Sequence, residues 1–284
     1  MLGRNEGMKS SLVLVLLILA RPSFASDSLS GILLFSPNES IVHQETRWAI
    51  HDFETGKTAA LPWAKGNWAA LSPDGRQIVF STPEKNEKQT IRFGSWRQEK
   101  FESATFPQWY VREMSWDNTG NKIFLDYGAY DISLGTYTRY SVPDKTQIRP
   151  APDGQKRALF YYSDPVNIEI VSGEDRIKLP PASELPAWSR QSDAIAYARE
   201  GELVVYDLAS KSERQLTSFK SASEFVAKPT FSPDGKKIAF CLAHKKDIPR
   251  YLIGAYSSIF VINRDGTGLR KLFSGCDPSW GAKS

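Results

Sequence analysis

A short polar turn followed by a short apolar run recurs along this chain. The two clearest copies are LSPDGRQIVF, from Leu71, and FSPDGKKIAF, from Phe231. Proline presets φ in such a turn, the aspartate side chain caps it, and glycine takes the left-handed conformation. The run that follows is apolar at consecutive positions, which is typical of a strand covered on both faces. The pattern predicts structural β-hairpin turns at Pro73, Asp74 and Gly75 and at Pro233, Asp234 and Gly235.

An aromatic or apolar anchor precedes each copy of the turn. The anchors are Leu71, Trp116, Pro150, Trp188, Phe231 and Trp280, and the copy at Pro150 carries one extra residue. Neighbouring anchors lie between 34 residues (116 to 150) and 49 residues (231 to 280) apart. A second hairpin follows each copy, most clearly IFVINRDGTGLRKL from Ile259 to Leu272. Four short strands at this period are typical of β-propeller blades, so we interpret the recurring anchors as core residues.

The two ends of the chain complement each other. GILLFSP, residues 31–37, matches the second strand of a blade, whereas DPSWGAKS, residues 277–284, matches a first strand. Aligning Trp280 with Phe231, and Leu33 with Ile238, brings the two ends into one register. Pairing them would remove two exposed sheet edges. We therefore expect an all-β fold: a six-bladed propeller of four-stranded antiparallel blades, closed by the carboxyl-terminal strand completing the amino-terminal blade.

The repeated phrase resembles the TolB-type propeller repeat. The resemblance rests on FSPDGKKIAF followed by IFVINRDGTGLRKL and extends over residues 30–284, with degenerate copies between 110 and 180. It implies a propeller without the separate α/β domain that precedes the propeller in TolB itself. WD-repeat propellers fit less well, because no Gly-His and Trp-Asp pair recurs along the chain.

The first 25 residues read as a secretory signal peptide. Arg4 and Lys9 precede the apolar run Leu12–Ala20, and small residues lead to a cleavage site after Ala25. The alternative is an uncleaved anchor, but nine apolar residues fall short of the ~20 that a spanning helix needs. We expect a periplasmic or secreted bacterial protein whose residues 26–284 form the TolB-like propeller, with no transmembrane anchor after cleavage.

Charge and cysteine content limit the partners. Cleavage would remove three basic residues and one acidic residue and lower the net charge from +4 to +2, which argues against nucleic acid. Cys241 and Cys276 are the only cysteines. Export permits a disulfide between them. Because we place them after the second and fourth strands of one blade, a bridge requires the following loop to fold inward. Two buried thiols remain the alternative.

The longer loops on one face of the propeller form a candidate binding surface. Loops that carry binding residues tend to be long and held by a rigid scaffold. The longest runs from Leu242 to Ser258. We expect an aromatic and basic rim that receives a protein or an anionic ligand; solvated charges and packed aromatics are the alternative. Its residues are Lys245, Lys246, Arg250, Tyr251, Tyr256, Trp63, Trp109 and Tyr110, with Lys65 and Lys220 beside them.

Motifs for catalysis are absent from the sequence. It contains no G-x-S-x-G, no glycine-rich phosphate loop and no C-x-x-C. His43, His51 and His244 show no metal-ligand spacing. We assign His51 to a strand, and His43 and His244 to loops of adjacent blades that meet near the channel mouth. We predict no catalytic residue, metal or cofactor, and favour a binding or scaffold module with a protein partner in the cell envelope. A lyase or lactonase with its site at the channel mouth is the alternative, and the oligomeric state is left open.

Overall fold

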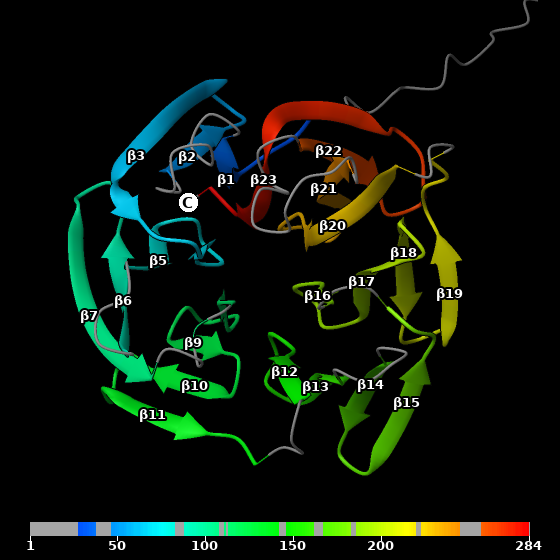
Figure 1. Ribbon diagram of the computed structural model, residues 1–284, viewed down its shortest axis with the longest axis horizontal. Helices are drawn as coiled ribbons and strands as arrows, with labels where there is room; N and C mark the ends of the chain where they lie inside the picture. Colours follow the sequence, from blue (N-terminus) through cyan, green and yellow to red (C-terminus); the bar gives the residue numbers. More distant parts are fainter. Residues whose placement is uncertain are drawn as a thin grey trace, which may run out of the picture.

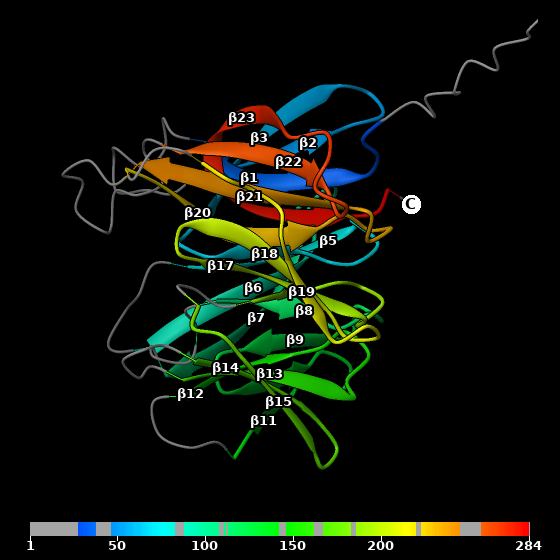
Figure 2. The same cartoon turned by 90° about the vertical axis from the view of Figure 1, so that its right-hand side faces the viewer.

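A computed structural model describes most of the chain after residue 27. The described residues are 28–37, 47–82, 88–107, 111, 113–141, 146–161, 167–182, 186–219, 223–244 and 257–283. Their regular secondary structure consists of β-strands, arranged as sheets around a central axis (Figure 1; Figure 2). The described part of the chain contains no helix that is long and apolar enough to cross a membrane. The predicted signal peptide lies outside the described residues.

Four sheets are separate four-stranded antiparallel blades. The first contains β4 (Ala69–Leu71), β5 (Gln77–Ser81), β6 (Lys88–Ser95) and β7 (Lys100–Pro107). The second contains β8 (Ser115–Trp116), β9 (Lys122–Leu125), β10 (Gly128–Asp131) and β11 (Thr136–Arg139). The third contains β12 (Thr146–Pro150), β13 (Lys156–Tyr161), β14 (Asn167–Ser172) and β15 (Asp175–Leu179). The fourth contains β16 (Ala187–Trp188), β17 (Ala194–Arg199), β18 (Glu202–Asp207) and β19 (Ser212–Gln215).

The fifth sheet has seven strands in the order β20-β21-β22-β23-β1-β2-β3. Its strands are β20 (Glu224–Phe231), β21 (Lys237–His244), β22 (Ser258–Asn263), β23 (Arg270–Gly281), β1 (Ile32–Pro37), β2 (Arg47–Asp52) and β3 (Lys57–Lys65). The all-β propeller is thus confirmed, but the sheets are four blades and one larger sheet rather than six separate blades. The difference arises because β23 is one continuous strand, where the sequence indicated a loop between two strands.

β23 joins the two halves of the seven-stranded sheet. Its first part pairs with β22, and its second part pairs with β1. Trp280 faces Leu33 in this second part, as Phe231 faces Ile238 in the neighbouring hairpin. The carboxyl-terminal segment therefore lies beside the first strand in the register that the repeat indicated.

Each of the other anchors also pairs with the residue seven positions further along. The pairs are Leu71 with Ile78, Trp116 with Ile123, Pro150 with Arg157 and Trp188 with Ile195. The extra residue inferred in the copy at Pro150 therefore does not lie between the anchor and its partner. A uniform register means that equivalent positions of the inner strands lie at equivalent heights along the central axis.

The hydrophobic core lies between neighbouring sheets. Alternate side chains of a strand point to opposite faces, so each blade packs on both sides. Trp116 and Trp280 are 6% and 4% exposed, which confirms that these anchors are core residues. The indole Nε1 of Trp116 donates to the Ala70 carbonyl of the preceding blade at 3.1 Å, and that of Trp188 donates to the Arg149 carbonyl at 2.8 Å. The anchors thus link inner strands around the ring.

The repeated turns have the hydrogen bonds that their residues imply. The Asp74 carboxylate accepts from the Ser72 hydroxyl at 2.6 Å and from the Arg76 amide at 3.0 Å, while Gly75 has a φ of 70°. The Asp234 carboxylate accepts in the same way from Ser232 and Lys236, and Gly235 has a φ of 72°. Both aspartates therefore cap hairpin turns.

Candidate functional site in the central cavity

Six inner strand segments surround a cavity of 210 Å³ on the central axis. They are β4, β8, β12, β16, β20 and the second part of β23, together with the residues that flank them. Because these segments share one register, their side chains form levels defined by distance from the anchor. We call the level three residues before the anchor the upper level, the one immediately before it the middle level, and the one two residues after it the lower level.

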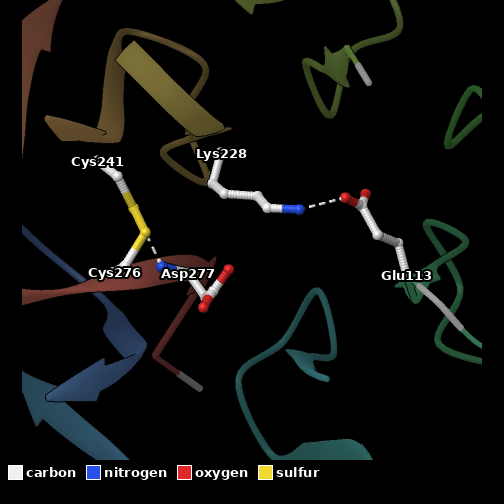
Figure 3. The surroundings of a disulfide bond; sticks show 5 residues. All are labelled: Glu113, Lys228, Cys241, Cys276 and Asp277. Atoms are coloured by element: carbon white, nitrogen blue, oxygen red, sulfur yellow. Dashed lines mark hydrogen bonds and ion pairs between the residues drawn. A yellow bond between two sulfur atoms is a disulfide. The ribbon is translucent and has the colours of Figure 1, made fainter. Parts of the chain in front are cut away.

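Charged side chains meet at the upper level. Lys228, from β20, forms an ion pair with Glu113, which precedes β8 (Figure 3). Arg149, from the middle level of β12, pairs with the same carboxylate. The Lys228 ammonium also lies 5.2 Å from the ring centroid of Trp68, within the range of a cation–π contact. Strands far apart in the sequence therefore share one charge cluster.

Lys228 and a second charged residue of the upper level, Asp277 of β23, have an unusual backbone. Lys228 and Asp277 occupy equivalent positions, and they have φ values of 51° and 52°. The pairing register shifts beside each of them, so both sit at β-bulges. A left-handed conformation costs a non-glycine residue about 1–2 kcal/mol, and bulges redirect side chains, often beside functional sites. The repeated strain at this level identifies the upper level as a candidate site.

The two carboxyl groups respond oppositely to burial. Burial alone would raise the pKa of Glu113, but Lys228 and Arg149 outweigh it and lower that pKa. Burial raises the pKa of Asp277; Lys228 opposes the rise, and the Glu113 charge adds to it. Of the two carboxyl groups, Asp277 therefore binds a proton more readily than Glu113 does.

A disulfide lies next to Asp277 of the upper level. Cys241 and Cys276 are bonded, with their Cα atoms 5.2 Å apart. Cys276 immediately precedes Asp277, whose amide donates to the Cys241 sulfur at 3.1 Å (Figure 3). Cys241 lies within β21 rather than after it, and Cys276 lies within β23 rather than after a strand. The bulged strand β23, and not a loop, brings the second sulfur inward.

The residues of the predicted rim are distributed differently from the sequence expectation. Trp63 lies within β3 instead of a loop, and its ring packs 4.7 Å from that of Phe101 and 5.5 Å from that of Phe80. Lys65 is the exposed last residue of β3. The others fall outside the described residues: Trp109, Tyr110, Lys220, Lys245, Lys246, Arg250, Tyr251 and Tyr256.

The histidines form no cluster within the described chain. His51, in β2, has its Nδ1 2.8 Å from the Thr58 hydroxyl and packs against Phe273, and burial lowers its pKa despite the opposing charge of Asp52. His244 ends β21 rather than lying in a loop, and its Nδ1 lies 3.7 Å from the Glu224 carboxylate. His43 is not among the described residues. In the described part no group of three metal-ligating side chains occurs.

The charged residues of the cavity were missed by the sequence reasoning. Glu113, Lys228 and Asp277 each lie three residues before an anchor. The other three copies have Trp68, Gln147 and Leu185 at this position, so the column is mixed and only half of its residues are charged. Their meeting needs the ring, because 115 residues separate Glu113 from Lys228.

Known structures place the chain in the propeller class. No family model and no curated protein sequence matches it. The chain is similar to the structure of TolB from Acinetobacter baumannii, with 16% identity, a TM-score of 0.67, and coverage of 90% of this chain and 68% of that one. It is similar to a putative TolB from Agrobacterium tumefaciens, with 14% identity, a TM-score of 0.62, and coverage of 87% and 90%.

A neighbour with another description shares the fold. A putative 6-phosphogluconolactonase from Bacteroides uniformis has 16% identity and a TM-score of 0.52, with coverage of 85% of this chain and 81% of that one. At these identities the likeness concerns architecture alone. The protein has a TolB-type propeller fold, and its function must be argued from its own site.

Proposed function

We propose that the protein is an exported, non-catalytic propeller that binds a partner at the mouth of its central cavity. The ring in this proposal has six blades: the seven-stranded sheet counts as two, which share β23, and this strand closes the ring. The partner is a protein of the cell envelope or an anionic ligand. Net charge and the described charge distribution give no reason to include nucleic acid.

The observation that carries the proposal is the charge cluster at the upper level. Inner strands run from the long-loop face toward the tight turns, so the upper level lies toward the long-loop face. Glu113 and Lys228 pair there across the cavity, and Lys228 has a left-handed backbone conformation at a bulge of β20. Partly exposed charges at a cavity mouth steer and orient an incoming partner. Because Glu113 is already held by two cations, the cluster is built for recognition rather than for proton transfer.

Two features support a location outside the cytoplasm. The signal sequence before residue 26 directs the chain out of the cytoplasm, and the disulfide is of the kind that persists in an oxidising compartment. The likeness to structures described as TolB adds support for a role in binding. We accordingly place the mature chain, residues 26–284, in the periplasm or outside the cell.

Cross-linking capture in the periplasm tests the proposal. Wild-type protein should retain a specific partner that is lost with Lys228→Gln and with the double variant Arg250→Ala/Tyr251→Ala. Lys100→Gln, which alters an exposed residue at the start of β7, serves as the matched control and should retain the partner. Equal capture by the wild type and both test variants would refute the proposed surface.

A second candidate function is enzymatic. Asp277 combines a raised pKa with a neighbouring Lys228 inside a cavity, which is a feature of acid–base sites. A lyase or lactonase would use such a pair. Turnover of a sugar lactone or an acidic sugar that Asp277→Asn abolishes, while partner capture is unchanged, would favour this candidate over the binding module.

A further inference from the structure

Below the charge cluster, the cavity wall changes character. At the middle level, three hydroxyl side chains, Ser115, Thr230 and Ser279, line the cavity with Arg149. The other two middle positions are alanines. Both carboxylates of the described lining, Glu113 and Asp277, belong to the upper level. The cavity lining at the middle and lower levels therefore offers hydrogen-bond donors and contains no carboxylate of its own, although Arg149 pairs with Glu113 of the upper level.

The hydroxyl groups keep their protons available. Ser115 accepts from Arg149 at 3.4 Å, and Ser279 accepts from the Leu71 amide at 3.0 Å. Each serine thus uses a lone pair within the protein, and neither hydroxyl proton has an acceptor among the described residues. A hydroxyl that has accepted one bond can still donate one. Both hydroxyl protons are therefore available to a hydrogen-bond acceptor on a ligand in the cavity.

Arg190 adds a positive charge at the lower level. Three copies of the turn have proline at this position, whereas the turn that follows β16 reads Ser-Arg-Gln-Ser, with Ser192 at a φ of 55°. The Arg190 guanidinium lines the cavity and donates one hydrogen bond, to the Trp280 carbonyl at 3.3 Å. Among the described residues it has no ion-pair partner within 4 Å.

The position of Arg190 is energetically costly without an anion. Burial lowers its pKa to about 10, although the charge of Asp74 opposes this. A guanidinium has five N–H donors and can donate two of them to the oxygens of one carboxylate or phosphate group. A partly buried cation with a single long hydrogen bond leaves most of that capacity unused, which is unfavourable unless a ligand supplies the missing acceptors.

We propose that the middle and lower levels form a binding site for a small oxyanion, held by Arg190 and by the hydroxyls of Ser115 and Ser279. The ligand carries a carboxylate or a phosphate group, since both present at least two anionic oxygens that accept hydrogen bonds. It enters from the long-loop face, past the Lys228–Glu113 pair. The site is separate from the partner surface proposed above, and its existence does not depend on that surface.

Calorimetric titration of the purified, disulfide-bonded protein with sodium phosphate and, separately, sodium acetate tests the site. Sodium chloride at matched ionic strength is the blank. We expect saturable binding of one or both anions. Arg190→Gln should weaken it at least tenfold, since a hydrogen bond to a charged group corresponds to roughly one to two orders of magnitude in affinity. Arg97→Gln, which alters an exposed arginine stacked on Trp96, should bind within twofold of the wild type.

Two additional measurements guard against a folding artefact. In wild-type protein, the side-chain Nε–H resonance of Arg190 should shift on adding the anion that binds. Ser115→Ala, which keeps the guanidinium, should weaken binding less than Arg190→Gln does. Phosphate binding alone identifies a phosphoryl ligand, and acetate binding identifies a carboxylate. Binding of neither anion, or equal binding by wild type and Arg190→Gln, would overturn the proposal.

Discussion

Two boundaries of the propeller are held together in contrasting ways. Where β23 lies beside β1, it pairs on both edges, a disulfide joins it to β21, and seven buried residues form the core cluster. Between the β8–β11 blade and the β12–β15 blade, the buried cluster consists of Ile148, Leu159 and Val171, with Tyr140 and Tyr161 packed on it. The chain connects the blades at both boundaries, through β23 at the first and between β11 and β12 at the second, so the contrast lies in the packing and the disulfide.

The contrast predicts which boundary between blades opens first. A circular array is exposed at its termini, because a frayed end would leave sheet edges unpaired. Here the terminal junction has a continuous strand and a covalent bond, so we expect local opening at the thinly packed boundary instead. Local stability follows buried apolar contact and covalent restraint rather than distance from the chain ends.

The largest expected effect comes from removing the junction anchor. Trp280→Ala would delete a side chain that is 4% exposed, together with its 2.8 Å hydrogen bond to the Ser30 carbonyl. We expect a loss of about 3–5 kcal/mol in the free energy of unfolding, as for other buried aromatic truncations. Urea denaturation measures it. Leu134→Ala, at a site 71% exposed, is the control and should be near neutral. A loss below about 1 kcal/mol would mean that the junction does not stabilise the ring.

Removing the disulfide should have the next largest effect. The bond closes a loop across a sequence separation of 35 residues. Loop-closure entropy for that length corresponds to about 3–4 kcal/mol of stabilisation. Cys241→Ala/Cys276→Ala should lose this amount in chemical denaturation. Reductant should destabilise the wild type by a similar amount and leave the double variant unchanged; a wild type indifferent to reductant would contradict the proposed role of the bond.

A truncation at the opposite boundary should act more locally. Leu159→Ala would leave a cavity in the smallest of the inter-sheet clusters, at a cost of about 2–3 kcal/mol. Hydrogen exchange should then accelerate in β8–β12 before it does in β22, β23 and β1. The matched variant Leu33→Ala, at the junction, should not produce this order of exchange. Uniform acceleration in both variants would show that the two boundaries open as one unit.

The repeat explains why much of the fold could be predicted from the sequence. Turn chemistry recurs at Pro73 and at Pro233, and the anchors fix the register, so the pairing of Trp280 with Leu33 followed from alignment alone. The continuity of β23 did not, because Gly275-Cys276-Asp277 resembles a loop in composition and its bulge depends on tertiary pairing.

The site was harder to predict from the sequence than the fold, because it depends on contacts between distant strands. Sequence patterns favoured aromatic and basic residues in long loops, yet the charges that converge are on inner strands. A charged residue before an anchor acquires meaning only when the ring brings another opposite to it, as Lys228 is brought to Glu113. The left-handed conformations of Lys228 and Asp277 have no local sequence signal, since neither is glycine or lies in a recognisable turn.

The smallest expected effect is on the pH dependence of stability. The pKa of Asp277 is raised in the folded protein, so the native state binds a proton more tightly than the unfolded state does. Its contribution is fully present below the unfolded value near 3.8 and is lost as the pH rises through the folded pKa. Asp277→Asn removes that loss, and asparagine tolerates the φ of 52°. The variant should therefore gain stability relative to the wild type between pH 4 and pH 7.

Urea denaturation of both proteins across that range measures the difference. The pKa of Glu113 is shifted the opposite way, so its stabilising contribution is lost as the pH falls, but this occurs in both proteins and cancels in the comparison. Asp265→Asn, in an exposed turn where hydrogen bonds from Thr267 lower the pKa below its ordinary value of 3.8, is the control, and its difference from the wild type should stay constant over this range. A pH-independent difference for Asp277→Asn would mean that the cluster keeps Asp277 charged throughout.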